Sequence, residues 1–243
     1  MENLPAIFLL AIGASFVQRT TGFGFGIFIM TLLPFLMPSY GEATALSGLL
    51  AFVTSVIGTC KYWRYITWKR LVTILSVFMV TSTAAICMLK IMQDVTIRQV
   101  LGVILILVSI YFTFLSKRIR FGTTLPYQIG AGSVSGLMGG FFGMHGPPAV
   151  LYFINSEPDK MHYMGMTQIY FALTNLAMSF VRAGNGFVTV SVWKSFAVGL
   201  GAIAIGSALG AWAFSRIPGK VFPYVVYGYI GVSGIIILIS TLN

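Results

Sequence analysis

Charge is what this chain most clearly lacks. Only 8% of its 243 residues are charged and only five are acidic, whereas 57% are hydrophobic. A water-soluble domain normally carries about 25% charged residues. Apolar runs long enough to cross a bilayer fill the sequence, and no stretch between them could hold a sizeable soluble domain. The composition therefore predicts one polytopic all-α membrane domain over residues 1–243.

Patterns that carry catalysis or bind metal are also missing. The two cysteines, Cys60 and Cys87, form no CxxC pair. No third ligand lies near either histidine, and the chain has no G-x-S-x-G, no HExxH and no pair of intramembrane carboxylates. The start, Met1–Asn3, lacks the basic region of a cleaved signal peptide. We expect no enzyme, no cofactor and no metal site.

The excess of positive charge has a topological explanation. A net charge of +10 would suggest a nucleic-acid partner in a soluble protein. Here most Lys and Arg residues stand in short loops between apolar runs, where they set the orientation of membrane spans. We therefore expect the lipid bilayer as a partner, and no nucleic acid.

The first apolar stretch, Leu4–Pro38, is too long to cross the membrane once. It has 35 residues, with Arg19 as its only charge, and a span needs about 20. It is either a broken span or a hairpin that turns at Arg19–Gly26 and leaves on the side it entered. The other expected spans are Ala43–Cys60, Trp68–Lys90, Gln99–Leu115, Tyr127–Ile154, Tyr163–Val181, Trp193–Phe214 and Phe222–Ile239.

The two halves of the chain repeat one plan. At an offset of 121 residues, Gly22 corresponds to Gly143 and Lys61 to Arg182. We expect repeat 1 over residues 4–115, a basic linker over 116–125 and repeat 2 over 126–241, an internal duplication typical of transporters. If each half begins with a hairpin, the repeats are inverted, whereas eight simple crossings would make them parallel. The Lys and Arg distribution does not separate the two, and the length of Leu4–Pro38 favours hairpins.

Each half contains one apolar stretch that cannot form a regular helix. These stretches are Gln18–Gly26, with three alternating glycines, and Gly139–Pro148, with four glycines and two prolines. In hydrocarbon, free backbone groups are tolerated only inside protein or beside a water-filled cavity. A pair of interrupted segments at corresponding positions points to a transport site. We expect the two stretches to face each other in mid-membrane.

Arg19 is the main candidate for binding a substrate. A charge in mid-membrane costs about 2.5–3.5 kcal/mol on insertion scales, and all five carboxylates lie at termini or in loops. An unpaired guanidinium matches an external anion. The structural alternatives are that Arg19 snorkels to an interface or binds the carbonyls of the broken helix.

Other residues near the breaks complete the candidate site. Backbone N–H groups at glycines of a break can converge on an anion, and His145 could donate a hydrogen bond or titrate. Gln168 and Asn175 share one face of the next second-half span. Packing is the alternative for His145, and interhelical hydrogen bonding for the amides. The expected substrate-binding residues are Gln18, Arg19, Thr20, Gly22, Gly24, Gly26, Gly143, His145, Gly146, Gln168 and Asn175.

The residues Gly140–Tyr152, read as GFFGMHGPPAVLY, resemble a motif of the TauE/SafE family of sulfite and organosulfonate exporters, and Val17–Gly26 resembles its first-half motif. The resemblance covers essentially the whole chain. His145 stands where that motif has a small residue, often glycine. The resemblance implies a multi-pass permease of the bacterial inner membrane that exports a small sulfur-containing anion such as sulfite or sulfoacetate.

Two other functions stay open from the sequence. The same residues could line an anion channel, or the chain could be a membrane assembly subunit that transports nothing. Export of an anion from an inside-negative cell is favourable by about 2.3 kcal/mol per charge per 100 mV, so no intramembrane carboxylate is needed for ion coupling. A homodimer is also a possible assembly.

Overall fold

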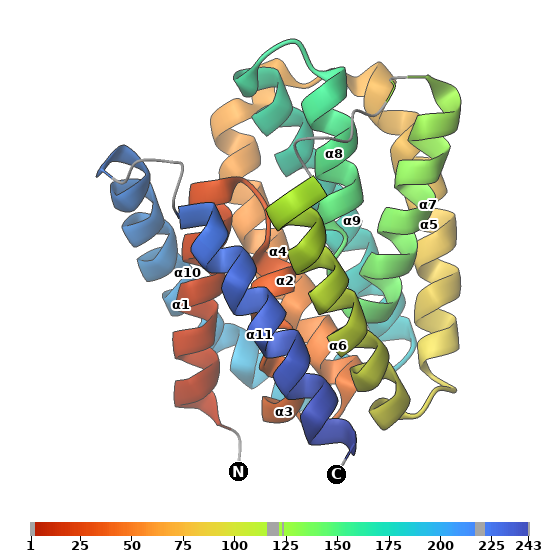
Figure 1. Ribbon diagram of the computed structural model, residues 1–243, viewed down its shortest axis with the longest axis vertical. Helices are drawn as coiled ribbons and strands as arrows, with labels where there is room; N and C mark the ends of the chain where they lie inside the picture. The colour runs from red at the N-terminus through yellow and green to blue at the C-terminus, as the bar shows by residue number, and fades with distance from the viewer. Residues whose placement is uncertain (1–2, 116–121, 123, 217–221, 243) are drawn as a thin grey trace.

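The computed structural model describes residues 3–115, 122, 124–216 and 222–242 (Figure 1). Residues 116–121 and 123 of the predicted basic linker 116–125 lie outside these residues, as do Pro218 and Lys220 between the last two predicted spans. Every regular element in the described ranges is helical, which confirms the all-α prediction. Within the described residues, five helical segments are long and apolar enough to cross a membrane: Leu4–Thr21, Tyr40–Tyr65, Leu71–Leu89, Asp94–Phe114 and Val190–Ala213.

The helices follow the expected spans closely. The first half contains α1 (Leu4–Thr21), α2 (Phe25–Ile29), α3 (Leu33–Leu36), α4 (Tyr40–Tyr62), a 3₁₀ turn η1 (Trp63–Tyr65), α5 (Trp68–Leu89), α6 (Asp94–Ile110) and a π-helical turn η2 (Tyr111–Leu115). The second half contains α7 (Leu125–Phe142), α8 (Gly146–Ser156), α9 (Lys160–Gly184), α10 (Val190–Arg216) and α11 (Phe222–Leu242).

The first interrupted element folds back on itself. Helix α1 ends at Gly22, which has φ +85°, and α2 begins after Gly24, which has φ +96°. Both angles are in the left-handed region that only glycine adopts readily. The returning chain packs on α1, since a Cβ added to Gly13 would lie 2.6 Å from the Phe28 ring. Helix α3 then lies near the same end of the molecule as the start of α1 (Figure 1).

The second interrupted element has the same form and approaches from the other end. Helix α7 ends at Gly143, with φ +66°, and α8 begins at Gly146. Figure 1 shows α7 descending from the upper end of the molecule and α8 returning to it. At that end the rings of Tyr65 and His162 lie 5.3 Å apart, so the α8–α9 turn is beside the α4–α5 loop.

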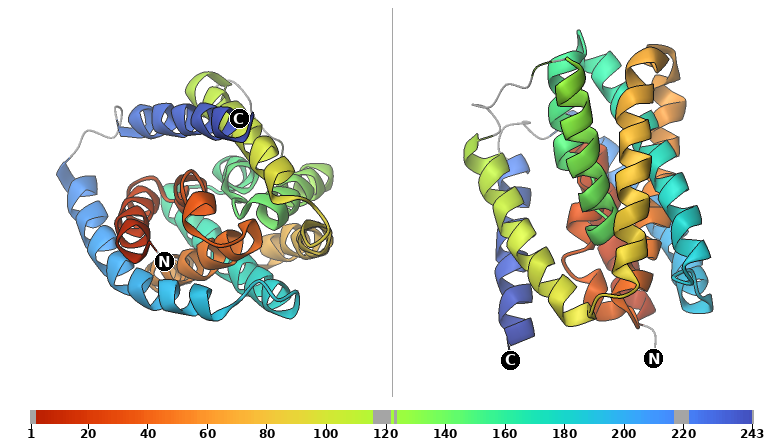
Figure 2. Two further views of the ribbon diagram at one scale, coloured as in Figure 1. Left: turned by 90° about the horizontal axis from the view of Figure 1, so that it is seen from below. Right: turned by 90° about the vertical axis from the view of Figure 1, so that its right-hand side faces the viewer.

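Helices α4 and α9 run through the centre of the molecule and pack against each other. Ser39 caps α4 and Asp159 caps α9, each accepting backbone N–H groups of the first turn. Around this pair, α1 packs with α10, α5 with α7 and α6 with α11. Figure 2 shows α10 along the outside of α1. The two breaks are thereby enclosed by protein.

Candidate functional site

The two breaks touch at two glycines. A Cβ added to Gly26 would overlap the carbonyl oxygen of Gly143 and would lie 3.3 Å from Cα of Met144. Because both obstacles are backbone atoms, neither can move aside as a side chain could. The close approach of the two elements therefore depends on the missing side chain at position 26.

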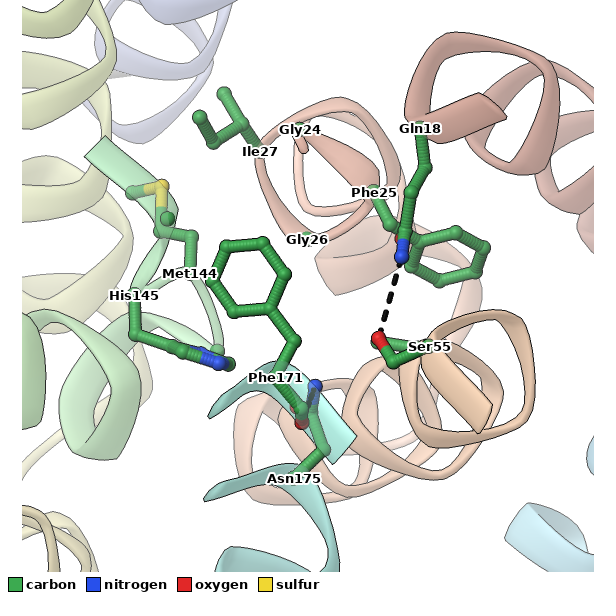
Figure 3. Close-up of a pocket in the computed structure, with 13 residues that line it drawn as sticks. Gln18, Gly24, Phe25, Gly26, Ile27, Ser55, Met144, His145, Phe171 and Asn175 are labelled. Atoms are coloured by element: carbon green, nitrogen blue, oxygen red, sulfur yellow. Dashed lines mark hydrogen bonds between the residues drawn. The ribbon is translucent and has the colours of Figure 1, made fainter. Parts of the chain in front are cut away.

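A small cavity, here called the central cavity, lies where the breaks meet (Figure 3). Its volume is about 20 Å³, which is room for about one water molecule. An oxyanion such as sulfite needs more space, so this conformation is closed. The lining residues are Gln18, Gly24, Phe25, Gly26, Ile27, Ala51, Ser55, Gly143, Met144, His145, Gly146, Phe171 and Asn175.

His145 contributes an imidazole that is 5% exposed and packs against the ring of Phe171, with the centroids 5.2 Å apart. Its Nε2 lies 2.9 Å from the hydroxyl of Thr174. That hydroxyl is 2.7 Å from the carbonyl of Tyr170, so it donates there and accepts from Nε2–H. Nδ1 is then a bare acceptor, and it has no partner among the described residues.

Gln18 connects the central cavity to a second one, here called the Arg19 cavity. The Gln18 amide nitrogen donates to Ser55 at 3.2 Å, and its oxygen accepts from Thr54 at 3.1 Å. The Arg19 cavity also has a volume of about 20 Å³. Its lining residues are Ser15, Gln18, Arg19, Thr54, Ile57, Gly58, Tyr62, Met164, Gln168 and Ser207.

Arg19 thus lies next to the central cavity and not in its lining. It is in the last turn of α1, and a Cβ added to Gly210 of α10 would lie 2.7 Å from its own Cβ. Among the described residues no ion pair involves Arg19. Its neighbour Thr20 lines neither cavity, because its hydroxyl donates to the carbonyls of Phe16 and Val17.

Gln168 and Asn175, both on α9, are brought to different cavities. Gln168 lines the Arg19 cavity and donates at 2.8 Å to the carbonyl of Gly22, which the break leaves free. Asn175 lines the central cavity. Its amide nitrogen donates to the carbonyl of Phe171 at 2.8 Å, and its Oδ1 is buried without a partner among the described residues.

Arg182 is the functional candidate that sequence reasoning missed. Its side chain is fully buried, and Nη2 donates to the carbonyls of Gly139 at 2.7 Å and Gly140 at 3.2 Å. These carbonyls belong to the last turn of α7, so Arg182 caps the second break. The alignment with Lys61 suggested a loop residue at the end of a span. The sequence does contain a sign that Arg182 is not in a loop. Asp159 can cap a helix, and the 25-residue helix that begins after it continues past position 182.

A larger cavity among the described residues is not a good place for an anion. A groove of about 480 Å³ lies between α6, α7 and α8. Its lining is aliphatic and aromatic, with no charged residue. Polar side chains line the two small cavities at the breaks instead, and Arg19 lines one of them.

Comparison with known proteins identifies the chain through one family model. The model described as sulfite exporter TauE/SafE matches residues 7–237, nearly the whole chain. Neither the curated proteins nor the solved structures include a match.

Proposed function

Because the chain belongs to the TauE/SafE family of sulfite exporters, we propose that it exports a small sulfur-containing anion, such as sulfite, sulfoacetate or a related organosulfonate. Family members are transporters and not enzymes, and the chain is a multi-pass membrane protein. The anion would cross through the Arg19 cavity and the central cavity. The observation that carries this proposal is the meeting of two interrupted elements beside a guanidinium that has no carboxylate partner among the described residues.

The order of the cavities along α4 and α9 gives the proposal a direction. Tyr62 and Met164 line the Arg19 cavity, near the basic segment Lys61–Arg70, which the positive-inside rule puts in the cytoplasm. The central cavity is further along, between Ala51 of α4 and Phe171 of α9. A cytoplasmic anion would therefore meet Arg19 first and the two breaks second.

An inverted repeat is part of the proposal. Each half would contribute one re-entrant hairpin and three crossings, and the hairpins would enter from opposite sides. Two contacts support this topology. The Tyr65–His162 ring contact brings the α8–α9 turn beside the α4–α5 loop, which would be cytoplasmic. The hydroxyl of Thr189 donates at 2.8 Å to Glu42 at the start of α4, so the α9–α10 turn would be outside.

We assign the roles of the remaining residues as follows. Arg19 supplies charge at entry, and His145 binds the anion in the central cavity in the tautomer that carries its proton on Nδ1, with Nε2 then accepting from Thr174. Gln18 and Gln168 are the amides at the Arg19 cavity, and Asn175 is the amide of the central cavity. The backbone around Gly22–Gly26 and Gly143–Gly146 forms the cradle, and Thr20 supports the last turn of α1. Since both cavities are closed, transport requires the hairpins to separate.

Proteoliposome flux tests the function. Vesicles with the wild-type protein should move radiolabelled sulfite in a saturable way, faster when the sulfite-containing side is negative. Arg19→Ala should lower the flux at least tenfold, and Arg64→Ala, which removes an exposed loop charge, should leave it unchanged. Fast flux without saturation would indicate a channel instead. If neither sulfite nor any organosulfonate crosses the vesicle membrane, the chain is not an exporter of this class. If the Arg19→Ala variant instead loses a bound partner protein, the chain is an assembly subunit.

A further inference from the structure

Arg182 has more hydrogen-bond donors than the described residues use. A guanidinium has five N–H groups, and the two on Nη2 face the carbonyls of Gly139 and Gly140. Within the described part of the chain, Nη1 has only a 3.9 Å contact with the sulfur of Met178, and Nε has no partner. Three N–H groups of a fully buried cation therefore lack an oxygen acceptor.

No carboxylate neutralises this cation within the described part of the chain. The two acidic side chains at the nearby end of α4 and α6 are engaged elsewhere. Glu42 accepts from Ser39 and Thr189, and Asp94 accepts from the backbone N–H of Tyr40 at 2.9 Å. A buried charge without a counter-charge is strongly unfavourable. The presence of this buried cation is explained if an anion binds beside Arg182 during part of the transport cycle.

Gly48 places no side chain between the backbone of α4 and Arg182, and the contacts there are too close for an anion until the helices move apart, as transport requires. A Cβ added at Gly48 would lie 3.2 Å from Arg182 Nη1, 3.6 Å from the Ser179 hydroxyl and 3.9 Å from Asn175 Oδ1. Three polar side chains therefore converge on the bare side of this glycine. The free donors to an anion are those of Arg182, because Asn175 Oδ1 is an acceptor and the Ser179 hydroxyl donates to the carbonyl of Asn175 at 2.7 Å. Ser47, the preceding residue, is also fully buried, and its hydroxyl has no partner among the described residues.

This place continues the route set by the two cavities. Asn175 lines the central cavity and also faces Gly48. Ala51 lines the central cavity. Gly48 precedes it in α4 by three residues, slightly less than one helical turn, and so lies nearer the start of the helix. The point beside Gly48 and Arg182 is therefore on the side of the central cavity opposite to Arg19.

We propose that Arg182, Gly48 and Ser179 form a second anion subsite, which receives a small oxyanion from the central cavity before release. The proposal rests on the proposed export function, which puts this subsite on the outer side. Sulfite and sulfonate groups fit it by chemistry, because they present several oxygens to the free edge of a guanidinium. Two uncompensated arginines would then flank the closed central cavity, one on each side.

The subsite can be tested by anion binding without any transport. Sulfite, methanesulfonate and chloride are titrated against the purified protein in detergent, and the rise in melting temperature gives apparent affinities. Gly48→Ala should weaken sulfite and methanesulfonate at least tenfold, because its Cβ fills the space beside Nη1. The matched control is Gly184→Ala on α9, whose Cβ would meet nothing within 4 Å, and it should bind like the wild type.

Substitutions of Arg182 separate binding from capping. Arg182→Gln should reduce the anion-dependent rise at least as much as Gly48→Ala does, whatever its effect on the unliganded protein, and Arg182→Lys should retain more of it through its charge. If Arg182→Gln changes only the unliganded melting temperature, Arg182 is only a cap and the inference is wrong. Because Gly48→Ala leaves Arg182 and its carbonyl partners in place, it decides the question even if Arg182→Gln does not fold.

The same variants distinguish this inference from the export function. In one outcome, the wild-type protein exports sulfite, the Arg19→Ala variant does not, and the Gly48→Ala variant exports and binds sulfite normally. This outcome refutes the subsite and supports the export function. If no anion crosses any vesicle but Gly48→Ala still loses the anion-dependent rise, the exporter is refuted and the subsite stands. A wild type that no anion stabilises contradicts the subsite directly.

Discussion

The two breaks have the same shape, and the same helix holds both of them by different chemistry. In the first, the carbonyl of Gly22 accepts from the neutral amide of Gln168. In the second, the carbonyls of Gly139 and Gly140 accept from the Arg182 guanidinium. Both donors belong to α9. An interrupted membrane helix needs a donor for its free carbonyls, and an amide is sufficient. The charge at the second break therefore calls for a further explanation, which an anion supplies.

The same contrast recurs at the start of the two central helices. Ser39, a neutral hydroxyl, caps α4, whereas Asp159, a carboxylate, caps α9. In both comparisons the first half uses a neutral group and the second half a charged one. Four experiments test how far this difference matters, beginning with the contact that both breaks share.

The largest effect is expected for Gly26→Ala. Its Cβ would overlap the Gly143 carbonyl, and overpacking against atoms that cannot move costs about 1–3 kcal/mol or more. We expect a marked fall in folded yield and melting temperature. Gly146→Ala is the control, because its Cβ would find its nearest neighbour, Phe23, at an ordinary 3.6 Å. Equal behaviour of the two variants would mean that the breaks do not touch.

The next test compares the two donors on α9. Gln168→Met should lower the free energy of unfolding by about 1–2 kcal/mol, because it leaves the carbonyl of Gly22 buried without a donor. Arg182→Met removes two such bonds but also removes a buried cation that lacks a carboxylate, so these opposing effects should leave a smaller net change. Thermal or denaturant unfolding in detergent measures both. A much larger loss for Arg182→Met would indicate that the guanidinium is kept for stability.

The third test concerns Ser39, the neutral cap of α4. Ser39→Ala should destabilise α4 by about 1 kcal/mol, because the backbone N–H of Glu42 loses its acceptor. Ser39→Asp is the control, since aspartate caps equally well. The melting temperature of Ser39→Asp should match that of the wild type, and a fall as large as that of Ser39→Ala would argue against capping as the role of this residue.

The smallest effect is expected for substitution of Asp159, the charged cap of α9. Hydrogen bonds from the backbone and the ring of His162 lower the pKa of Asp159. Since its folded pKa is depressed, its contribution to stability is present above the unfolded pKa of about 3.9 and is lost as the pH falls through the lower folded value. Melting curves of wild type and Asp159→Asn should therefore differ slightly at pH 6 and converge below about pH 4. A constant difference across this range would contradict the assignment.

Much of the architecture follows from the sequence, because glycine, proline and long apolar runs act locally. The interruptions at Gly22 and Gly143 and the length of Leu4–Pro38 indicate broken elements before any packing is known. The position of Arg19 beside the central cavity could not be predicted, because it depends on how α1 rotates against α10. Arg182 was misjudged for a similar reason. Whether a basic residue near a helix end points inward or into solvent is set by neighbouring helices, here α4 and α7, and not by the residue itself.

The dependence of the first break on Gln168 has a consequence for how the chain matures. Gly22 and Gln168 are 146 residues apart, so α9 must leave the ribosome before that carbonyl finds its partner. Until then the nascent first hairpin is an unfinished insertion intermediate, in which water, lipid headgroups or an insertase must satisfy the backbone. Late synthesis of α9 would thus act as the closing step of biogenesis, and truncation before it should leave the first half vulnerable to quality-control proteolysis.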